Sequence, residues 1–405
     1  MKIFFVVIFF LIIDLYFYFG TESVIKESSF QNTYKIIYWL LCVLFYIGII
    51  YLVNKAREGE YVTISTIHSS VFFIFFAAKI IGITPLIIDD IIRFFKIILN
   101  TFSFKNEPFD LGRLLFLKKS ALIIGGVITT TLLLGIKWGR YNFKKNYTDI
   151  FIKNWNLDNY KIIQISDLHL GSFDSIDKLN TAVEMINEES ADLVVFTGDL
   201  VNNFYHEAIP YIETLGKIKA KDGKFSILGN HDYGDYTPYR RGSGKWKDNF
   251  KKIVEIQNQM GFEVLMNESR IIKRKGNMFN LVGVENWGAG SFTKDGDLDL
   301  AMKNVNDKLP TILLSHDPSH WKEVVFKSKY KIDLQLSGHT HGMQFGIEIP
   351  GFKWSPIKYR YENWAGLYKK NNKMIYVNRG LGHLGYAGRV GIMPDISILN
   401  FKAEI

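Results

Sequence analysis

Five short groups of aspartate, asparagine and histidine residues follow apolar, β-branched runs in the second half of the chain. The groups are Asp167-Leu168-His169, Gly198-Asp199, Gly229-Asn230-His231-Asp232, Ser315-His316 and Gly338-His339-Thr340-His341. Carboxylate, amide and imidazole groups together suit divalent transition metals. Two such ions about 3.5–4 Å apart neutralise a phosphoryl group and acidify the water that attacks it. The five groups, in this order, therefore predict a two-metal hydrolytic centre.

The runs that precede these groups predict an α/β domain. Strand patterns at 161–165, 191–196 and 225–228 alternate with helical patterns at 178–189 and 207–219, an order typical of a parallel sheet. Further strands, enough for two packed sheets, are predicted at 279–284, 311–314, 334–336, 374–377 and 396–399. Ligands of open α/β sheets bind beyond the carboxyl ends of strands, which is where all five groups fall.

The first 137 residues predict a membrane domain. Two uncharged stretches, at 36–53 and 120–136, are long enough to span a bilayer. Two further apolar stretches, at 3–19 and 70–88, contain one charge each. About four transmembrane helices are therefore expected within residues 1–137, followed by a basic linker at 138–154 and a catalytic domain at 155–405. The first helix is expected to be retained, because no small-residue cleavage site follows it.

Two charges lie at membrane depth in these stretches, Asp14 and Lys79. They are expected to pair between the first and third helices, or else to reach toward helix ends. Residues 86–99 alternate apolar pairs with charges, which fits an amphipathic helix at the membrane interface or a solvated helix end. Loops on the two sides carry similar numbers of Lys and Arg, so both orientations of the chain stay open.

The formal net charge of +9 falls mostly in the membrane part, and the second half is close to neutral. A basic region beside membrane helices is typical of a topology signal or of attraction to anionic lipid. The expected partners are the lipid bilayer and a phosphoester substrate, and no nucleic acid is expected. Cys42, the single cysteine, excludes a disulfide within the chain.

The five groups resemble the pattern of the calcineurin-like metallophosphoesterase superfamily, which is D-x-H, G-D, G-N-H-[DE], H and G-H-x-H. The phrases at 165–169, 228–233, 314–318 and 335–342 are similar to those of its membrane-associated phosphodiesterase branch, and the resemblance covers residues 158–403. It implies a four-layer αββα sandwich with two mixed sheets. One departure is Gly342-Met343-Gln344, where many members have Gly-Gly-Gln, at the rim of the site.

The resemblance also implies a role for each motif residue. Asp199 would bridge two metals, His231 would act on the phosphoryl group without binding a metal, and Asp232 would orient His231 by accepting its other ring proton. The remaining ligands divide between the metals, with Asp167, His169 and His341 on the first and Asn230, His316 and His339 on the second. The two divalent ions would be manganese, iron or zinc.

These features predict a membrane-anchored phosphohydrolase. It would be a phosphodiesterase or a pyrophosphatase that uses a metal-bridging hydroxide on a lipid-linked or envelope phosphoester. One alternative is a catalytically silent metal-binding interaction scaffold of the same fold, and another is a transporter or sensor in which the helices do the main work. The complete motif set, His231 included, argues against the scaffold, and the scarcity of membrane charges argues against the transporter.

The segment 233–246, which follows the His231 group, is aromatic and basic with several glycines. Its Arg240, Arg241 or Lys245 could hold a distal phosphate or a lipid headgroup, although a solvated loop is the alternative. Arg379 is a further candidate for substrate contact. Of the four histidines outside the motifs, His383 is the one expected to reach substrate, and the others are expected to pack or to lie on the surface.

Overall fold

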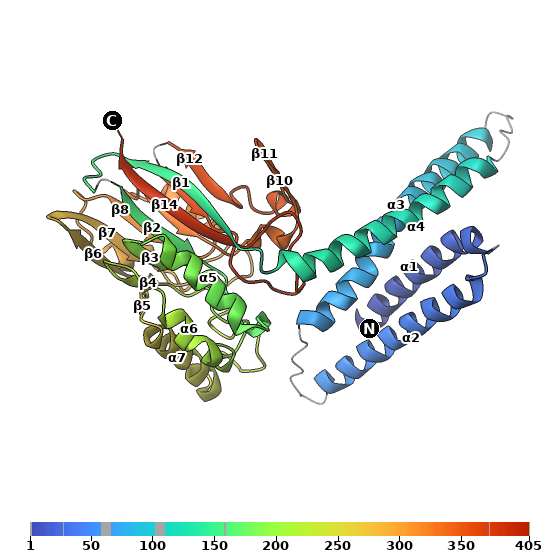
Figure 1. Ribbon diagram of the computed structural model, residues 1–405, viewed down its shortest axis with the longest axis horizontal. Helices are drawn as coiled ribbons and strands as arrows, with labels where there is room; N and C mark the ends of the chain where they lie inside the picture. Colours follow the sequence, from blue (N-terminus) through green and yellow to red (C-terminus); the bar gives the residue numbers. More distant parts are fainter. Residues whose placement is uncertain are drawn as a thin grey trace. The chain divides into compact units, whose positions relative to one another are not determined.

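Residues 2–26, 28–57, 66–101, 110–157, 159–371 and 373–404 are described by the computed structural model of the protein. The chain forms two compact units, Met1–Leu134 and Gly135–Ile405 (Figure 1). The loops expected after the second and third spans fall largely on 58–65 and 102–109, which lie outside the described residues.

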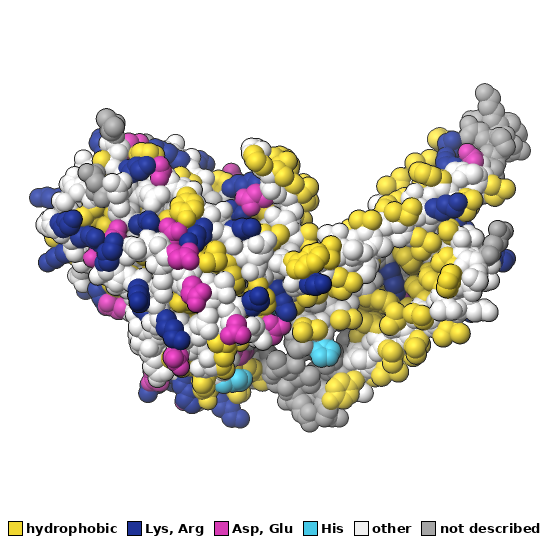
Figure 2. Space-filling model, in the orientation of Figure 1, with side chains coloured by type: hydrophobic (Ala, Val, Ile, Leu, Met, Phe, Trp, Pro, Cys, Tyr) yellow, Lys and Arg dark blue, Asp and Glu magenta, His cyan; other side chains and the backbone are white. Residues whose placement is uncertain are grey.

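Long helices form the first unit: α1 (Lys2–Ile25), α2 (Gln31–Arg57), α3 (Thr66–Thr101) and α4 (Leu111–Leu134). Each contains a stretch long and apolar enough to cross a membrane, as predicted. Many of their large apolar side chains are exposed, which is the distribution expected where lipid replaces water (Figure 2). The span predicted at 70–88 and the helix predicted at 86–99 are one continuous helix, α3, which passes through Pro85.

The two membrane-depth charges pair inside this unit. Lys79 Nζ lies 2.5 Å from Asp14 Oδ1, and both side chains are buried. The Tyr46 hydroxyl donates to the other carboxylate oxygen of Asp14 at 2.5 Å. Lys79 Nζ also lies 3.3 Å from the centre of the Phe75 ring, a cation–π contact. The predicted pairing of Asp14 with Lys79 is therefore confirmed, and neither side chain reaches for a helix end.

Two six-stranded sheets form the second unit. The first has the order β1-β14-β2-β3-β4-β5 and the second the order β12-β13-β9-β8-β7-β6. Strands of the first sheet are β1 (Lys144–Ile152), β2 (Tyr160–Ile165), β3 (Leu193–Phe196), β4 (Lys224–Ser226), β5 (Glu263–Val264) and β14 (Asp395–Ala403). Strands of the second are β6 (Glu268–Arg274), β7 (Asn277–Gly283), β8 (Thr311–Leu314), β9 (Leu334–Ser337), β12 (Gly366–Lys370) and β13 (Lys373–Val377). Both sheets are mixed, because β14 is antiparallel to β2, β6 to β7 and β12 to β13.

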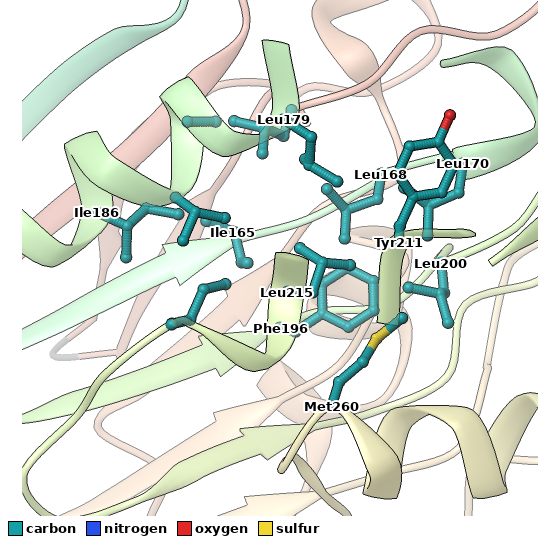
Figure 3. Close-up of a cluster of buried hydrophobic side chains, with 14 of the residues drawn as sticks. Ile165, Leu168, Leu170, Leu179, Ile186, Phe196, Leu200, Tyr211, Leu215 and Met260 are labelled. Atoms are coloured by element: carbon teal, nitrogen blue, oxygen red, sulfur yellow. The ribbon is translucent and has the colours of Figure 1, made fainter. Parts of the chain in front are cut away.

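Helices cover the outer face of each sheet, which gives four layers. Ile163 and Ile165 of β2 pack under α5 (Ile176–Glu188), α6 (Ile212–Gly216) and α7 (Gly244–Gln259) in one apolar cluster (Figure 3). The preceding residue, Ile162, faces the second sheet instead, because successive strand residues point to opposite faces. On the far side, α8 (Leu298–Met302) and α9 (Ser319–Glu323) pack on the second sheet. The predicted αββα sandwich with two mixed sheets is confirmed.

One predicted segment has a different structure. Residues 138–154 were expected to form a basic linker, but β1 occupies Lys144–Ile152 and pairs in parallel along its whole length with β14. The strand is an edge strand with mostly exposed or half-buried side chains, so its sequence lacks the apolar run of a central strand. One of its charges forms ion pairs within the second unit: Lys145 pairs with Glu188 at 2.8 Å and with Glu189 at 2.9 Å.

Candidate metal centre

The predicted motif residues meet at one edge of the two sheets. They follow the carboxyl ends of β2, β3 and β4 in the first sheet and of β8 and β9 in the second. Because these strands are neighbours and parallel within each sheet, their carboxyl ends lie together. Three overlapping groups of His and Asp side chains result, in each of which one ligand atom per residue lies within 4.8 Å of the others.

The first group consists of Asp167, His169 and His341, all buried. His341 Nε2 lies 3.2 Å from Asp167 Oδ1 and 3.0 Å from His169 Nε2. The sequence predicted these three residues as ligands of one ion. The structure brings them together from the ends of β2 and β9.

The second group consists of Asp199, His316 and His339. His316 Nε2 lies 3.1 Å from Asp199 Oδ2, and His339 Nδ1 lies 2.9 Å from Asn230 Oδ1. Asp199 also belongs to a group with His169 and His231, and its Oδ2 lies 3.5 Å from His169 Nε2. The Asp199 carboxylate thus stands between the two groups, as a bridging ligand must.

The hydrogen bonds of the outer ring nitrogens show that His169 and His316 turn Nε2 toward the centre. His316 Nδ1 lies 2.7 Å from the Thr197 carbonyl oxygen, which can only accept, so His316 carries its proton there. His169 Nδ1 lies 3.1 Å from Asn202 Oδ1. The Asn202 amide donates to Ser172 Oγ, which leaves Oδ1 as the acceptor. Nε2 is therefore the atom that each of these two rings would offer to a cation.

This arrangement fits divalent metal ions and is unfavourable without a positive charge. Burial lowers the pKa of His169 and of His339, so both rings are neutral at pH 7. Burial also lowers the pKa of His316, but the Asp199 carboxylate raises it further, to about 10. A metal cation beside Asp199 would balance the carboxylate charge in place of the proton that His316 carries. Two carboxylates, an amide oxygen and four imidazoles are a donor set that manganese, iron and zinc accept.

The backbone at the centre adopts an unusual conformation that the sequence did not indicate. Positive φ angles occur at five of the predicted ligands: Asp167 (51°), His169 (46°), Asp199 (61°), His339 (70°) and His341 (50°). Each such residue costs on the order of 1 kcal/mol or more, and such residues cluster at functional sites. Backbone hydrogen bonds hold two of them, from the Asp167 amide to the Gly198 carbonyl at 2.9 Å and from the His169 amide to the Asp199 carbonyl at 3.1 Å.

Two of the motif glycines are needed for space rather than for a turn. A Cβ atom at Gly338 would collide with Ser166 Oγ and with the Asp167 carboxylate, and one at Gly229 would collide with the Asp199 carboxylate. Gly198, by contrast, has a φ of 96°, a backbone conformation that glycine adopts without strain. At Gly229 and Gly338 the reason is the close approach of a ligand side chain.

Asp232 does not play the part expected of it. The ring Nδ1 of His231 lies 2.7 Å from the Asn202 carbonyl oxygen, which orients the ring. Asp232 accepts instead from backbone amides, at 2.9 Å from Asp199, 2.8 Å from Leu200 and 2.9 Å from Gly229. The prediction that Asp232 orients His231 is therefore wrong, because a buried carboxylate beside two strand ends satisfies the amides there first. Asp232 ties the Asp199 loop to the Gly229 loop.

The predicted substrate contacts also change. Arg241 pairs with Asp295 at 2.6 Å and with Asp235 at 3.5 Å. Arg379 is buried and pairs with Glu348 and, at 3.7 Å, with Asp395. These carboxylates already neutralise both guanidinium groups, whereas Arg240 is exposed and its role stays a prediction.

His383 was expected to reach substrate, but it is fully buried with its ring against Tyr141 and Phe173. Burial lowers its pKa to about 3, so it is neutral and part of the packing. A glycine-rich loop near the carboxyl end predicted exposure, and the burial depends on residues from distant parts of the chain.

Residues outside the motifs surround His339. The Tyr361 hydroxyl lies 2.8 Å from His339 Nε2, and the Phe292 ring contacts the His339 ring edge to face at 5.0 Å. The Arg360 guanidinium lies 5.6 Å from the Phe292 ring and 5.5 Å from the Tyr361 ring. These residues belong to no motif, so only the fold brings them to His339. Tyr236, whose hydroxyl accepts from Asn230 Nδ2 at 2.9 Å, lies in the aromatic segment that the sequence singled out.

Arg389 is a further residue outside the five groups. Its buried guanidinium donates to the carbonyl oxygens of His341, Arg379, Gly380 and Gly382. Four backbone acceptors on one cation fix the loop that carries His341. The buried charge therefore supports the position of a ligand without taking part in the ligand set.

Comparison with known proteins gives the same division of the chain. Residues 160–343 match a family model described as calcineurin-like phosphoesterase. Residues 1–140 match a model described as probable calcineurin-like phosphoesterase, transmembrane domain.

Three curated relatives extend this match. The chain is 32% identical over 251 residues to the uncharacterized metallophosphoesterase YkuE of Bacillus subtilis, a match that covers 61% of this chain and 80% of that protein. It is 30% identical over 255 residues to a transmembrane protein with metallophosphoesterase domain of Danio rerio, covering 61% and 54%. It is 28% identical over 271 residues to the UDP-2,3-diacylglucosamine pyrophosphatase LpxG of Chlamydia muridarum, covering 56% and 79%. The chain thus spans most of two of these relatives and about half of the Danio rerio protein.

Proposed function

This chain belongs to the calcineurin-like metallophosphoesterases, which are metal-dependent phosphoester hydrolases, and from that premise we propose that it is a binuclear enzyme of the membrane surface that cleaves a phosphodiester or a pyrophosphate. It is an integral membrane protein, and a lipid-linked phosphoester is its proposed substrate. The observation that supports the proposal most is the placement of the Asp199 carboxylate between two groups of inward-facing ring nitrogens.

In this proposal Asp167, His169 and His341 hold one divalent ion, and Asn230, His316 and His339 hold the other, with Asp199 between them. When bound, the ions would supply neutralisation of phosphoryl charge and a water of lowered pKa. The outer hydrogen bonds of His169 and His316 keep both rings in the ligating tautomer. A catalytically silent scaffold would not require the complete set of motif residues or the strained backbone at five of them, so both features favour an enzyme.

His231 has a separate proposed role. Its Nδ1 donates to the Asn202 carbonyl oxygen at 2.7 Å, so Nε2 is the atom available to the substrate. The ring is held edge to face against His169 at 4.8 Å and beside Tyr236 at 4.6 Å. In its protonated form, Nε2 would donate to the phosphoryl group or to the leaving oxygen. The contribution of a positioned general acid is about 10²- to 10⁴-fold in rate.

Arg360 is the proposed contact for a second anionic group of the substrate. Among the described residues no carboxylate forms an ion pair with it, in contrast to Arg241 and Arg379. It is exposed, and the rings of Phe292 and Tyr361 lie beneath its guanidinium next to His339. A planar guanidinium favours bidentate contact with phosphate oxygens. This preference supports a substrate with charge beyond the reacting phosphate, such as a pyrophosphate.

The test uses the full-length protein purified in detergent. A panel of phosphomonoester, phosphodiester and pyrophosphate substrates is assayed before and after treatment with a chelator, and again after manganese, iron or zinc is returned. We expect hydrolysis of diester or pyrophosphate that chelation abolishes and one of the metals restores. Folded protein that takes up no metal, or that binds two equivalents and hydrolyses none of the panel, would contradict the proposal.

A further inference from the structure

A small hairpin of the second unit exposes its apolar face. Strands β10 (Ile347–Ile349) and β11 (Phe352–Trp354) pair only with each other, in antiparallel register. Ile347 lies opposite Trp354, and Ile349 lies opposite Phe352. Side chains two positions apart on a strand share a face, so these four residues form one apolar surface. We call it the hairpin face.

The hairpin turns its apolar side chains outward, whereas a water-exposed hairpin usually turns them toward the protein core. Its polar side chains point to the domain, because Glu348 pairs with Arg379 and the Lys353 ammonium donates to the Ala365 carbonyl oxygen. The exposed fractions of Ile347, Ile349 and Phe352 are 52%, 58% and 52%. A strand pair that bonds its charged side chains to the domain and exposes its apolar side chains marks an interaction surface.

The hairpin begins beside the end of the last candidate membrane span. The last candidate span runs from Leu111 to Gly139, and Trp138 near its end is exposed, as is typical of residues at a membrane interface. Within the second unit, the Arg389 amide donates to the Gly135 carbonyl oxygen at 3.2 Å. One residue further on, the Val390 carbonyl oxygen accepts from the Gly346 amide at 3.0 Å, immediately before β10.

Contacts of a single short segment therefore connect the end of the span with the hairpin. A Cβ atom at Gly135 would touch the Tyr386 hydroxyl and Val390, so the helix end packs closely on this segment. The Tyr386 ring in turn stacks on Phe345 at 5.1 Å. Gly135, near the end of the span, and Gly346, at the root of the hairpin, therefore bond neighbouring residues of one segment, Arg389 and Val390.

We infer that the hairpin face inserts into the bilayer surface and is a second membrane contact of the protein, separate from the four helices. Phe352, Trp354 and the two isoleucines occupy the headgroup and upper acyl region, as interfacial apolar side chains do. The bilayer is the occupant that the exposed face and its place beside the exit of the span favour together.

A consequence for the proposed function follows from Met343. It lies two residues after the ligand His341, is 51% exposed, and leads through Phe345 and Gly346 into β10. With the hairpin face in the bilayer, this side of the metal centre lies at the lipid surface. An amphiphilic phosphoester would then reach the centre without leaving the membrane, and this last step rests on the proposed function.

The experiment places a nitroxide label on Ile349→Cys in the full chain, in a Cys42→Ala background. The protein is reconstituted in vesicles of phosphatidylcholine and phosphatidylglycerol, and collision rates of the label with oxygen and with a water-soluble nickel chelate are measured. The matched control is Ile271→Cys on β6, which is 44% exposed at the outer edge of the second sheet. We expect the label at 349 to collide mainly with oxygen and the label at 271 mainly with the nickel chelate.

Either of two results would overturn the inference. A label at 349 as accessible to the nickel chelate as the one at 271 places the face in water. A label at 349 that is immobilised and shielded from both reagents places it against protein, whether a second copy or another partner. No hydrolysis is measured, so failure here is distinguishable from failure of the proposed function, and a lipid-exposed label on an inactive protein would leave the inference standing.

Discussion

The membrane unit and the metal centre both bury charged side chains, but only one of them balances the charges with its own residues. In the membrane unit, Asp14 meets Lys79 at 2.5 Å, and the Tyr46 hydroxyl satisfies the other carboxylate oxygen. At the metal centre, no lysine or arginine of the described residues pairs with Asp167 or Asp199. Ring nitrogens face one another there, as His169 and His341 do at 3.0 Å.

The difference shows which buried charges are structural and which await a ligand. A buried pair that satisfies every donor and acceptor is complete as polypeptide. A buried cluster of acceptors is satisfied only when a cation binds. Such a cluster therefore lowers the stability of the metal-free protein and favours metal binding. The following predictions, from the largest effect to the smallest, test this contrast.

Removal of metal should have the largest effect. A chelator should abolish hydrolysis, and saturating metal should raise the free energy of unfolding of the second unit by about 2.7 kcal/mol at 100 times the dissociation constant. Thermal unfolding in detergent with and without metal measures the second effect. Asp199→Ala should remove the stabilisation by metal. An equal response of wild type and variant would show that the ions bind elsewhere.

Replacement of His231 by alanine should separate chemistry from metal binding. Turnover should fall about 10²- to 10⁴-fold, because the proposed proton donor is lost. Metal content, measured by elemental analysis, should stay at the wild-type value. The matched control is His206→Ala, an exposed histidine outside the centre. Loss of metal together with activity would make His231 a ligand.

Breaking the membrane pair should affect stability alone. Lys79→Met leaves a buried carboxylate without its partner and should lower the free energy of unfolding by about 3–5 kcal/mol. The double variant Asp14→Leu with Lys79→Met removes both charges and should recover most of that loss. Unfolding titrations in mixed detergent micelles compare the two. A double variant no more stable than the single one would show that the pair is not the source of the effect.

Removal of Arg360 should have the smallest effect of the four. Arg360→Ala should raise KM about 10- to 100-fold for a pyrophosphate, because a charge-assisted hydrogen bond contributes about 1.5–3 kcal/mol. KM for a phosphomonoester, which has no second anionic group, should change little. Arg240→Ala in the same assay tests the residue that the sequence suggested. A selective effect of Arg240 alone would move the substrate contact to the 233–246 segment.

The clustering of the predicted ligands could be foreseen because each of them follows a strand whose apolar run is evident in the sequence. Asp167 and His316 come directly after apolar runs, and parallel strands bring such positions to one edge. The pairing of Asp14 with Lys79 was predictable for a similar reason, since a lone charge at membrane depth has few partners. In both cases a strong local pattern and one physical constraint were enough.

Features that depend on distant contacts could not be predicted. Distant parts of the chain supply the Asp199 amide that bonds Asp232, the Asp295 carboxylate that pairs with Arg241, and the Glu348 carboxylate that pairs with Arg379. The Tyr141 ring that packs on His383 is distant in sequence as well. The strand β1 was missed because an edge strand with exposed polar residues resembles a linker until its partner is known. Side-chain roles at a rim are set by the fold, and spacing alone does not encode them.

The pairing of β1 with β14 has a consequence for biosynthesis. Asn146 of β1 bonds Asp395 of β14 across 249 positions of sequence, and β14 lies between β1 and β2 in the sheet. A ribosome therefore delivers the membrane helices and every motif residue before the strand that joins β1 to the rest of the sheet exists. During that interval β1 lacks its partner strand, and its unpaired backbone is accessible to proteases and chaperones. The sheet can close only after β14 has been translated.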